Sequence, residues 1–144
     1  MKYVDTNVII ACINDNDTNH SRAPKVIDGT AEMVTSPIAT LELRSVLSRT
    51  TTLTESEIGA YVDYLDEIRV KVPKINLESV FLMAEEISCK TKMKTLNVLH
   101  LSACLILRAD AFVTFDKEFI EKERTIQELG LRVQFSRSTR LEYN

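Results

Sequence analysis

The sequence predicts an α/β fold: a single three-layer α/β/α domain, residues 1–144, built around a central, mainly parallel sheet of four to five strands. Short segments rich in strand formers alternate with longer segments of helical periodicity along the chain. Strands separated by helices favour parallel pairing with helices on both faces. The length of 144 residues suits one domain, and no repeat, linker or low-complexity segment divides it. Residues 136–144 are predicted to form a loose tail.

Turn and cap residues set the bounds of the elements in the first half of the chain. Tyr3 and Val4 are strand formers that stop at Asp5, and an apolar helix follows. Gly29 ends the second helix, a common choice just after a helix C-terminus. After the next strand, Pro37 takes the first helical position, where no N–H is needed.

Similar signals bound the elements of the second half. Thr54 and Glu57 have capping-box spacing and open a helix. A strand stopped by Pro73 is predicted to lie at a sheet edge. Asn76 and Thr95 are predicted to cap the next two helices. Strands are thus predicted at residues 2–5, 32–35, 69–72, 111–115 and 131–135. Helices are predicted at residues 7–13, 20–28, 37–49, 54–67, 76–92, 95–107 and 117–129.

Composition excludes several classes of function. The formal charge of −3 provides no general attraction to nucleic acid, so phosphate contacts need a local basic patch or a bound cation. The three glycines lie far apart, which excludes the glycine-rich loops of P-loop NTPases and dinucleotide-binding enzymes. No apolar run is long enough to cross a bilayer, and the first strand leads into polar residues without a cleavage site. We therefore expect a cytoplasmic protein without a membrane span.

The cysteines and histidines give no sign of a zinc site. Cys12, Cys89 and Cys104 are odd in number, far apart, and each lies in an apolar helical stretch. This pattern favours reduced, buried cysteines over disulfides. His20 and His100 do not form a pair with metal-ligand spacing.

Carboxylates are predicted to converge at one edge of the sheet. Asp5 and Asp116 each follow directly on a strand, so both emerge at the carboxyl edge, whereas Asp110 precedes its strand and belongs to the opposite edge. Glu42 falls within the apolar arc of its helix, where a lone carboxylate needs a proton, a partner or a metal. A salt bridge to a neighbouring arginine is the alternative explanation for Glu42.

Asn97 is expected at the same edge, in the first turn of its helix. Taken alone, it is as readily explained as an ordinary N-terminal turn residue as by a role in the site. Three acids beside a neutral amide suit hard cations such as Mg²⁺ or Mn²⁺, which prefer oxygen ligands. Such an ion activates water and neutralises charge on a phosphate. The pattern therefore indicates phosphoester chemistry, and the spacing alone does not separate a nuclease from a phosphatase.

Four segments, in order along the full length, resemble the PIN-domain ribonucleases, including the toxin subunits of VapBC toxin–antitoxin pairs. They are Val4-Asp5-Thr6-Asn7-Val8-Ile9, Leu41-Glu42-Leu43 through Val46-Leu47, Val98-Leu99-His100-Leu101-Ser102-Ala103, and Val113-Thr114-Phe115-Asp116-Lys117-Glu118-Phe119. Each segment is a weak signal singly, and the ordered set is fairly specific. The resemblance implies a PIN-like domain that cleaves single-stranded RNA phosphodiesters with metal-activated water.

The resemblance also assigns roles to individual residues. It implies that Asp5, Glu42 and Asp116 are catalytic acids that bind Mg²⁺ or Mn²⁺. Thr6 and Thr114 are implied to support them by hydrogen-bonding ligands, water or the acids. The family usually has an aspartate where this chain has Asn97, and an asparagine adds no charge and accepts no proton. We therefore expect the cation to be held more weakly than in the family.

Other basic residues have two explanations each. Lys90, Lys92 and Lys94 precede the Asn97 helix, where they contact the RNA backbone or simply form a solvated charged turn. His100 lies within an apolar helix, where it is either a satisfied core residue or a catalytic acid.

Two alternatives to the ribonuclease stay open. A PIN-like scaffold that binds RNA or a protein partner without cleavage is motivated by Asn97. A haloacid-dehalogenase-like phosphatase is disfavoured, because its opening motif needs an aspartate where this chain has Asn7. For partners we expect single-stranded RNA, an antitoxin protein and a second copy in a homodimer. Exposed apolar residues of the helix near residues 56–67 are predicted to support such pairing.

Overall fold

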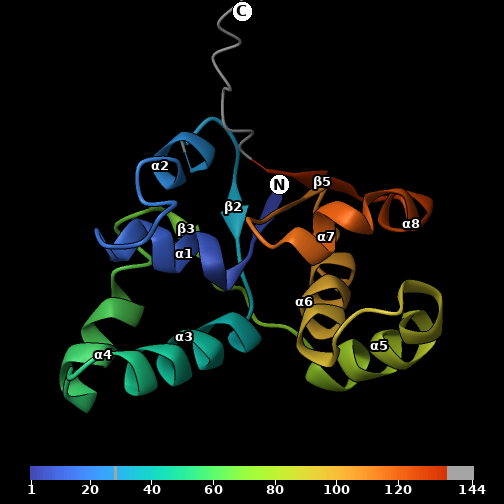
Figure 1. The fold of residues 1–144 in the computed structure, drawn as a ribbon. Coiled ribbons are helices and arrows are strands. Elements are labelled where there is room, and N and C mark those ends of the chain that lie inside the picture. Colours follow the sequence, from blue (N-terminus) through green and yellow to red (C-terminus); the bar gives the residue numbers. More distant parts are fainter. Residues whose placement is uncertain (28, 136–144) are drawn as a thin grey trace, which may run out of the picture.

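The computed structural model describes residues 1–27 and 29–135, and Figure 1 shows the chain as a ribbon. In this part of the chain one sheet is formed by β1 (Lys2–Val4), β2 (Met33–Val34), β3 (Val70–Lys71), β4 (Ala111–Val113) and β5 (Arg132–Gln134). The strand order is β3-β2-β1-β4-β5, and every neighbouring pair is parallel. The predicted α/β fold with a parallel sheet is confirmed, and β3 lies at an edge as its proline predicted.

Two layers of helices cover the sheet (Figure 1). The helices that pack on one face are α1 (Thr6–Ile13), α2 (Ala23–Val26), α3 (Pro37–Thr50) and α4 (Glu55–Asp63). Those that pack on the other face are α5 (Leu77–Thr91), α6 (Thr95–Ile106), α7 (Lys117–Glu121) and α8 (Glu123–Glu128).

The alternation of side chains along the strands supplies both layers with a core. Tyr3 and Phe112 belong to the cluster under α5 and α6, whereas Val4 and Val113 belong to the cluster under α1 and α3. The Phe112 ring stacks on Tyr3 with centroids 5.2 Å apart and on Phe119 at 4.2 Å. Burying each such ring stabilises the fold by about 1.5–3 kcal/mol.

Several predicted helices are shorter in the structure. The helix expected at 20–28 is reduced to α2, because turns held by Asn14 and Asp17 side chains compete with helical bonding before it. The helix expected at 54–67 ends at Asp63, followed by turns that lead to Arg69 with a φ of 60°. The last predicted helix is broken at Lys122 into α7 and α8.

Two further expectations are corrected or fall outside the described residues. Thr95 is the first helical residue of α6, and Lys94 occupies the cap position without a side-chain cap bond. Cys104 is buried and Cys12 half-buried, but the prediction that all three cysteines are buried is wrong for Cys89, which lies on the exposed face of α5. The predicted tail, residues 136–144, lies outside the described residues.

The strand order reverses direction between β1 and β4. From β1 the chain moves outward to β2 and β3, and β4 returns to the other side of β1. Val4 is in register with Val113, and the Asp5 N–H donates to the Val113 carbonyl at 2.9 Å. In open parallel sheets, ligands bind in the crevice at the carboxyl ends of strands where the order reverses. The topology therefore predicts a binding site formed by the residues just after β1 and β4.

Candidate active site

Asp5 lies at the end of β1 and is the N-cap of α1. Its side chain is buried, and Oδ1 accepts a hydrogen bond from the Thr6 backbone N–H at 2.8 Å. Oδ2 accepts from the Thr114 hydroxyl at 2.8 Å and from the Asn7 amide at 3.1 Å. These donors come from both sides of the strand-order reversal, so they hold the carboxylate in one orientation.

Asp116 lies after β4 and is the N-cap of α7. Its Oδ1 accepts from the Glu118 N–H at 2.9 Å, and its own N–H donates to the Thr114 hydroxyl at 2.9 Å. The Thr114 side chain therefore joins the two aspartates, since the same hydroxyl donates to Asp5. Together with the Asn7 side chain, which bonds Thr114 and the Phe115 N–H, this contact joins the carboxyl ends of β1 and β4 in one site.

Asn97 donates its side-chain amide to two carboxylates. Nδ2 lies 3.1 Å from Oδ2 of Asp116 and 3.4 Å from Oε1 of Glu118. Both acceptors are carboxylate oxygens, so only the orientation that turns Nδ2 toward them avoids repulsion. The amide thus donates hydrogen bonds to two acids without adding a charge.

Glu118 is part of this cluster, and the sequence interpretation did not single it out. Its Oε1 also accepts from the Lys94 backbone N–H at 2.7 Å, so it ties α7 to the start of α6. A signal for it existed, because Glu118 is the second acid within the Asp116 segment, but a surface acid in a first helical turn is common.

Glu42 reaches the site from α3. Its side chain is 22% exposed, and Oε1 lies 2.9 Å from Nε2 of His100. The alternative of an arginine salt bridge is not what the described residues show, because the ion pair recorded for Glu42 is with His100. His100 is fully buried, as expected for a satisfied core residue.

These residues line one cleft at the carboxyl edge of the sheet. The cleft has a volume of about 230 Å³ and is lined by Asp5, Thr6, Asn7, Ile10, Glu42, Val46, Asn97 and Asp116. The structure therefore brings together the three acids and Asn97, with Thr6 beside them and Thr114 behind Asp5. Lys90, Lys92 and Lys94 are exposed and do not line the cleft.

The donor set fits a hard divalent cation. Ligand atoms of Asp5, Glu42 and His100 lie within 4.8 Å of one another. Since His100 Nε2 already bonds Glu42 and is 3.9 Å from Asp5 Oδ1, the groups that remain for an ion are carboxylate oxygens. Thr6 is buried and lines the same cleft, where its hydroxyl would be able to contact a water held by such an ion. Oxygen ligands of this kind suit Mg²⁺ or Mn²⁺.

Asp5 and Glu42, whose carboxylate oxygens lie within 4.8 Å of each other, have opposite pKa shifts. Burial raises the pKa of Asp5, and the opposing effects of His100 and Thr114 do not cancel the rise. Burial also acts to raise the pKa of Glu42, but the effects of His100, Thr6 and Arg49 together outweigh it, so the pKa of Glu42 is lowered. Neighbouring carboxyls with divergent pKa values are typical of functional sites.

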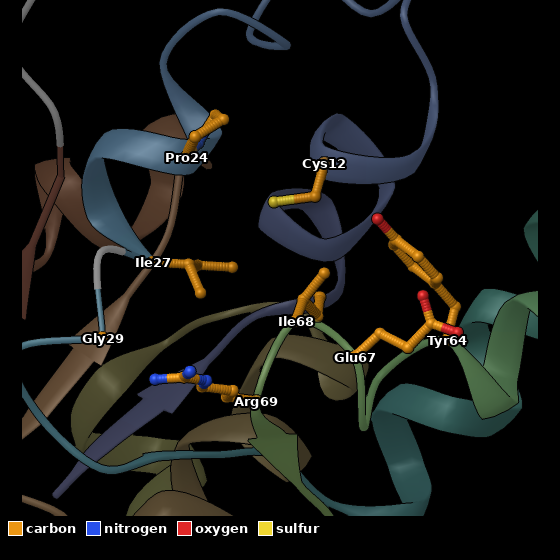
Figure 2. A pocket seen from close by; sticks show the side chains of 8 residues that line it. All are labelled: Cys12, Pro24, Ile27, Gly29, Tyr64, Glu67, Ile68 and Arg69. Atoms are coloured by element: carbon orange, nitrogen blue, oxygen red, sulfur yellow. The ribbon is translucent and has the colours of Figure 1, made fainter.

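A hollow at the other edge of the sheet lacks this chemistry. Figure 2 shows its lining side chains, among them Cys12 from α1 and Arg69, which precedes β3. Its volume is about 320 Å³, and Glu67 is the one carboxylate among the described residues that line it. Burial raises the pKa of Cys12 to about 11, so the thiol is not ionised near neutral pH and is a poor nucleophile.

The parallel sheet and the acidic cleft at its strand-order reversal place this chain among the α/β proteins that have an acidic site at the ends of their strands. The PIN domain family model matches residues 2–124, and the chain belongs to this family. A comparison with curated proteins found no match.

Solved structures with the same fold are similar to this chain. VapBC-1 from nontypeable Haemophilus influenzae has a TM-score of 0.66 at 20% identity, with 94% of this chain and 98% of that chain covered. Mycobacterium tuberculosis VapC20, a sarcin-ricin loop cleaving toxin, has a TM-score of 0.67 at 15% identity, covering 84% and 94%. VapBC2 from Rickettsia felis, bound to a promoter DNA fragment, has a TM-score of 0.66 at 16% identity, covering 94% and 98%.

Proposed function

We propose that this protein is a Mg²⁺- or Mn²⁺-dependent endoribonuclease that hydrolyses phosphodiester bonds of single-stranded RNA and is the toxin of a toxin–antitoxin pair. The observation that carries the proposal is the convergence of Asp5, Glu42 and Asp116 in one cleft at the strand-order reversal. Membership of the PIN family and the fold shared with VapBC-1 and with VapC20, a sarcin-ricin loop cleaving toxin, support it.

In this proposal Asp5, Glu42 and Asp116 hold the cation. When bound, the ion supplies an activated water and neutralises charge on the scissile phosphate. Thr114 keeps Asp5 and Asp116 at a fixed separation through its shared hydroxyl. The Asn7 amide helps to hold Asp5, since its Nδ2 donates to the carboxylate while its Oδ1 accepts from the Phe115 N–H.

Lys90, Lys92 and Lys94 are proposed to contact the RNA backbone outside the cleft. All three are exposed, and they lie at the end of α5 and in the turn to α6. Asn97 stands in the first turn of α6, so this turn brings positive charge toward a cleft lined by acids. Phosphate contacts of this kind position a substrate without reading its sequence.

The test is cleavage of a single-stranded RNA in the presence of Mn²⁺, with and without EDTA. Asp5→Asn is expected to abolish cleavage, because it removes the buried charge that faces the proposed cation. Asp63→Asn is a matched control, since Asp63 is exposed at the end of α4 and does not line the cleft. Cleavage that survives both EDTA and Asp5→Asn is the outcome that refutes the proposal.

A second candidate is a PIN-like scaffold that binds RNA or a protein partner without cutting. The observation that favours it is the Asn97 amide, which donates to Asp116 and Glu118 where the family usually has another acid. An Asn97→Asp variant that cleaves RNA while the unsubstituted protein is silent would support the scaffold.

We further propose a protein partner, an antitoxin, and a homodimer. VapBC-1 and VapBC2 are the structural relatives that motivate the antitoxin. Phe81 and Leu82 on α5 are 58% and 60% exposed, and such apolar side chains mark surfaces that pair with other proteins. The segment predicted for this role contributes less, since Tyr64 is its one large exposed hydrophobic residue among those described. Light scattering during size-exclusion chromatography, with and without a co-expressed antitoxin, measures both assemblies.

The compartment proposed for the protein is the cytoplasm. Within residues 1–27 and 29–135, no helix has the length and apolar character required to traverse a bilayer.

A further inference from the structure

His100 stands in the middle of α6, fully buried, yet both of its ring nitrogens have polar partners. Nε2 lies 2.9 Å from Oε1 of Glu42, and Nδ1 lies 2.9 Å from the Tyr3 hydroxyl. The Tyr3 hydroxyl in turn lies 2.6 Å from Oγ of Ser36. The ring thus connects an acid of the cleft to two hydroxyls in the core.

The partners assign a direction to this chain of hydrogen bonds. An ionised carboxylate only accepts, so His100 Nε2–H donates to Glu42. In the tautomer with its hydrogen on Nε2, Nδ1 accepts from the Tyr3 hydroxyl, and the Tyr3 oxygen accepts from the Ser36 hydroxyl. Every donor then has an acceptor, and all three bonds point toward Glu42. Burial raises the pKa of Tyr3, which keeps its hydroxyl protonated as a donor.

Ser36 lacks the hydrogen bond that is usual at its position in a helix and contacts Tyr3 instead. It is the N-cap of α3, and a serine at this position normally accepts a hydrogen bond from the helix backbone. Here its side chain makes no cap bond and contacts Tyr3 instead. A buried residue that gives up its usual local bond for a distant one is a sign of a role beyond local stability.

We propose that His100, supported by Tyr3 and Ser36, is a positioning residue that orients the Glu42 carboxylate for cation binding. The proposal rests on the proposed function, because it takes Glu42 to be a ligand of the metal. Glutamate has a long, flexible side chain, and a fixed bond at Oε1 reduces the conformational freedom lost when the carboxylate meets an ion. The same Nε2 is 3.9 Å from Asp5 Oδ1, so the ring also sets the spacing of the two acids.

The experiment measures Mn²⁺ affinity from the electron paramagnetic resonance signal of free Mn²⁺, together with thermal stability without metal. Tyr3→Phe and Ser36→Ala each remove one hydroxyl and keep the packing. Loss of a hydrogen-bond partner behind a metal ligand typically weakens binding about 10- to 100-fold, and we expect about tenfold for both variants. Ser102→Ala is the matched control, since this buried hydroxyl on α6 bonds the Val98 carbonyl and is expected to leave affinity unchanged.

A rescue pair separates positioning from packing. In His100→Gln the side-chain amide can reach the place of Nε2 and still donate to Glu42, whereas in His100→Asn the amide lies near the place of Nδ1. The glutamine variant is therefore expected to bind Mn²⁺ more tightly than the asparagine variant. Equal affinities in two variants that both fold would overturn the proposal.

A double-mutant cycle tests whether the effect passes through Glu42. In a Glu42→Gln background, Ser36→Ala is expected to change Mn²⁺ affinity by less than twofold. An undiminished effect in this background, or unchanged affinity of Tyr3→Phe and Ser36→Ala in the normal background, overturns the positioning role alone. Absence of Mn²⁺ binding by the unsubstituted protein overturns the proposed metal site, and the positioning role falls with it.

Discussion

Replacing Asn97 with aspartate exchanges an amide donor for a fourth carboxylate in the cleft, beside Asp5, Glu42 and Asp116. The hydrogen bond from Nδ2 to Asp116 Oδ2 at 3.1 Å is lost, and two carboxylates come to face each other at that distance. A hydrogen bond to a charged group contributes about 1.5–3 kcal/mol. The added repulsion lies between about 1 kcal/mol in water and about 4 kcal/mol near a protein surface.

Both residues are half-exposed, so solvent screens the charges and the lower part of the combined range applies. We expect Asn97→Asp to lower the free energy of unfolding by roughly 2–5 kcal/mol in EDTA. For a chain of 144 residues this corresponds to a fall in Tm of roughly 5–15 °C. If the proposed cation binds, it should offset much of this loss, because it would screen the repulsion and gain a ligand.

The assay is thermal unfolding followed by circular dichroism, in EDTA and over a series of Mn²⁺ concentrations. A ligand at 100 times its Kd stabilises the folded state by about 2.7 kcal/mol, so saturating Mn²⁺ should restore much of the lost Tm. The control is Asn76→Asp, which makes the same charge change at an exposed helix cap where aspartate serves equally well. A Tm of Asn97→Asp that is unchanged in EDTA, or that Mn²⁺ does not raise, would refute the reasoning.

Three further predictions concern the fold. Leu43→Ala should lower the free energy of unfolding by about 2–5 kcal/mol, because loss of its buried side chain leaves a cavity. Leu41→Ala on the same helix should change this free energy little, because Leu41 is 69% exposed. Urea unfolding of the two variants measures the difference. Gly130 has a φ of 84°, so Gly130→Ala should destabilise by about 1 kcal/mol, and Gly59→Ala in the open middle of α4 should stabilise by up to about 1 kcal/mol; opposite shifts in the urea midpoint are the expected result. The N-terminal ammonium bonds Asp110 and lowers its pKa below the usual 3.8, so this carboxylate stabilises the fold above pH 3.8 and loses its effect as the pH falls through its folded pKa. A Tm difference between the unsubstituted protein and Asp110→Asn that persists at the lowest pH would contradict this assignment.

The fold and the position of the cleft followed largely from local pattern. β1 ends at Val4, just before Asp5, and β4 ends at Val113, two residues earlier than expected and three before Asp116. Parallel strands still place the residues that follow them at one edge by geometry alone. Glu42 was identified by a similar local argument, because an acid within the apolar arc of a helix requires a partner. The local pattern predicted a helix to residue 67, but α4 ends at Asp63, because turns that helix propensity does not reveal follow it.

Other features depend on contacts between distant parts of the chain. His100 lies 58 residues from Glu42 and 97 from Tyr3, so no local pattern distinguishes its polar role from that of an ordinary core residue. The direction of the Asn97 amide depends on Asp116 and on Glu118, which only the packing of α6 against α7 brings within reach. The sequence by itself therefore determined which acids gather at the sheet edge, because strand direction sets that edge. The tertiary structure decided how those acids are held, because hydrogen bonds between side chains depend on distances that sequence separation does not encode.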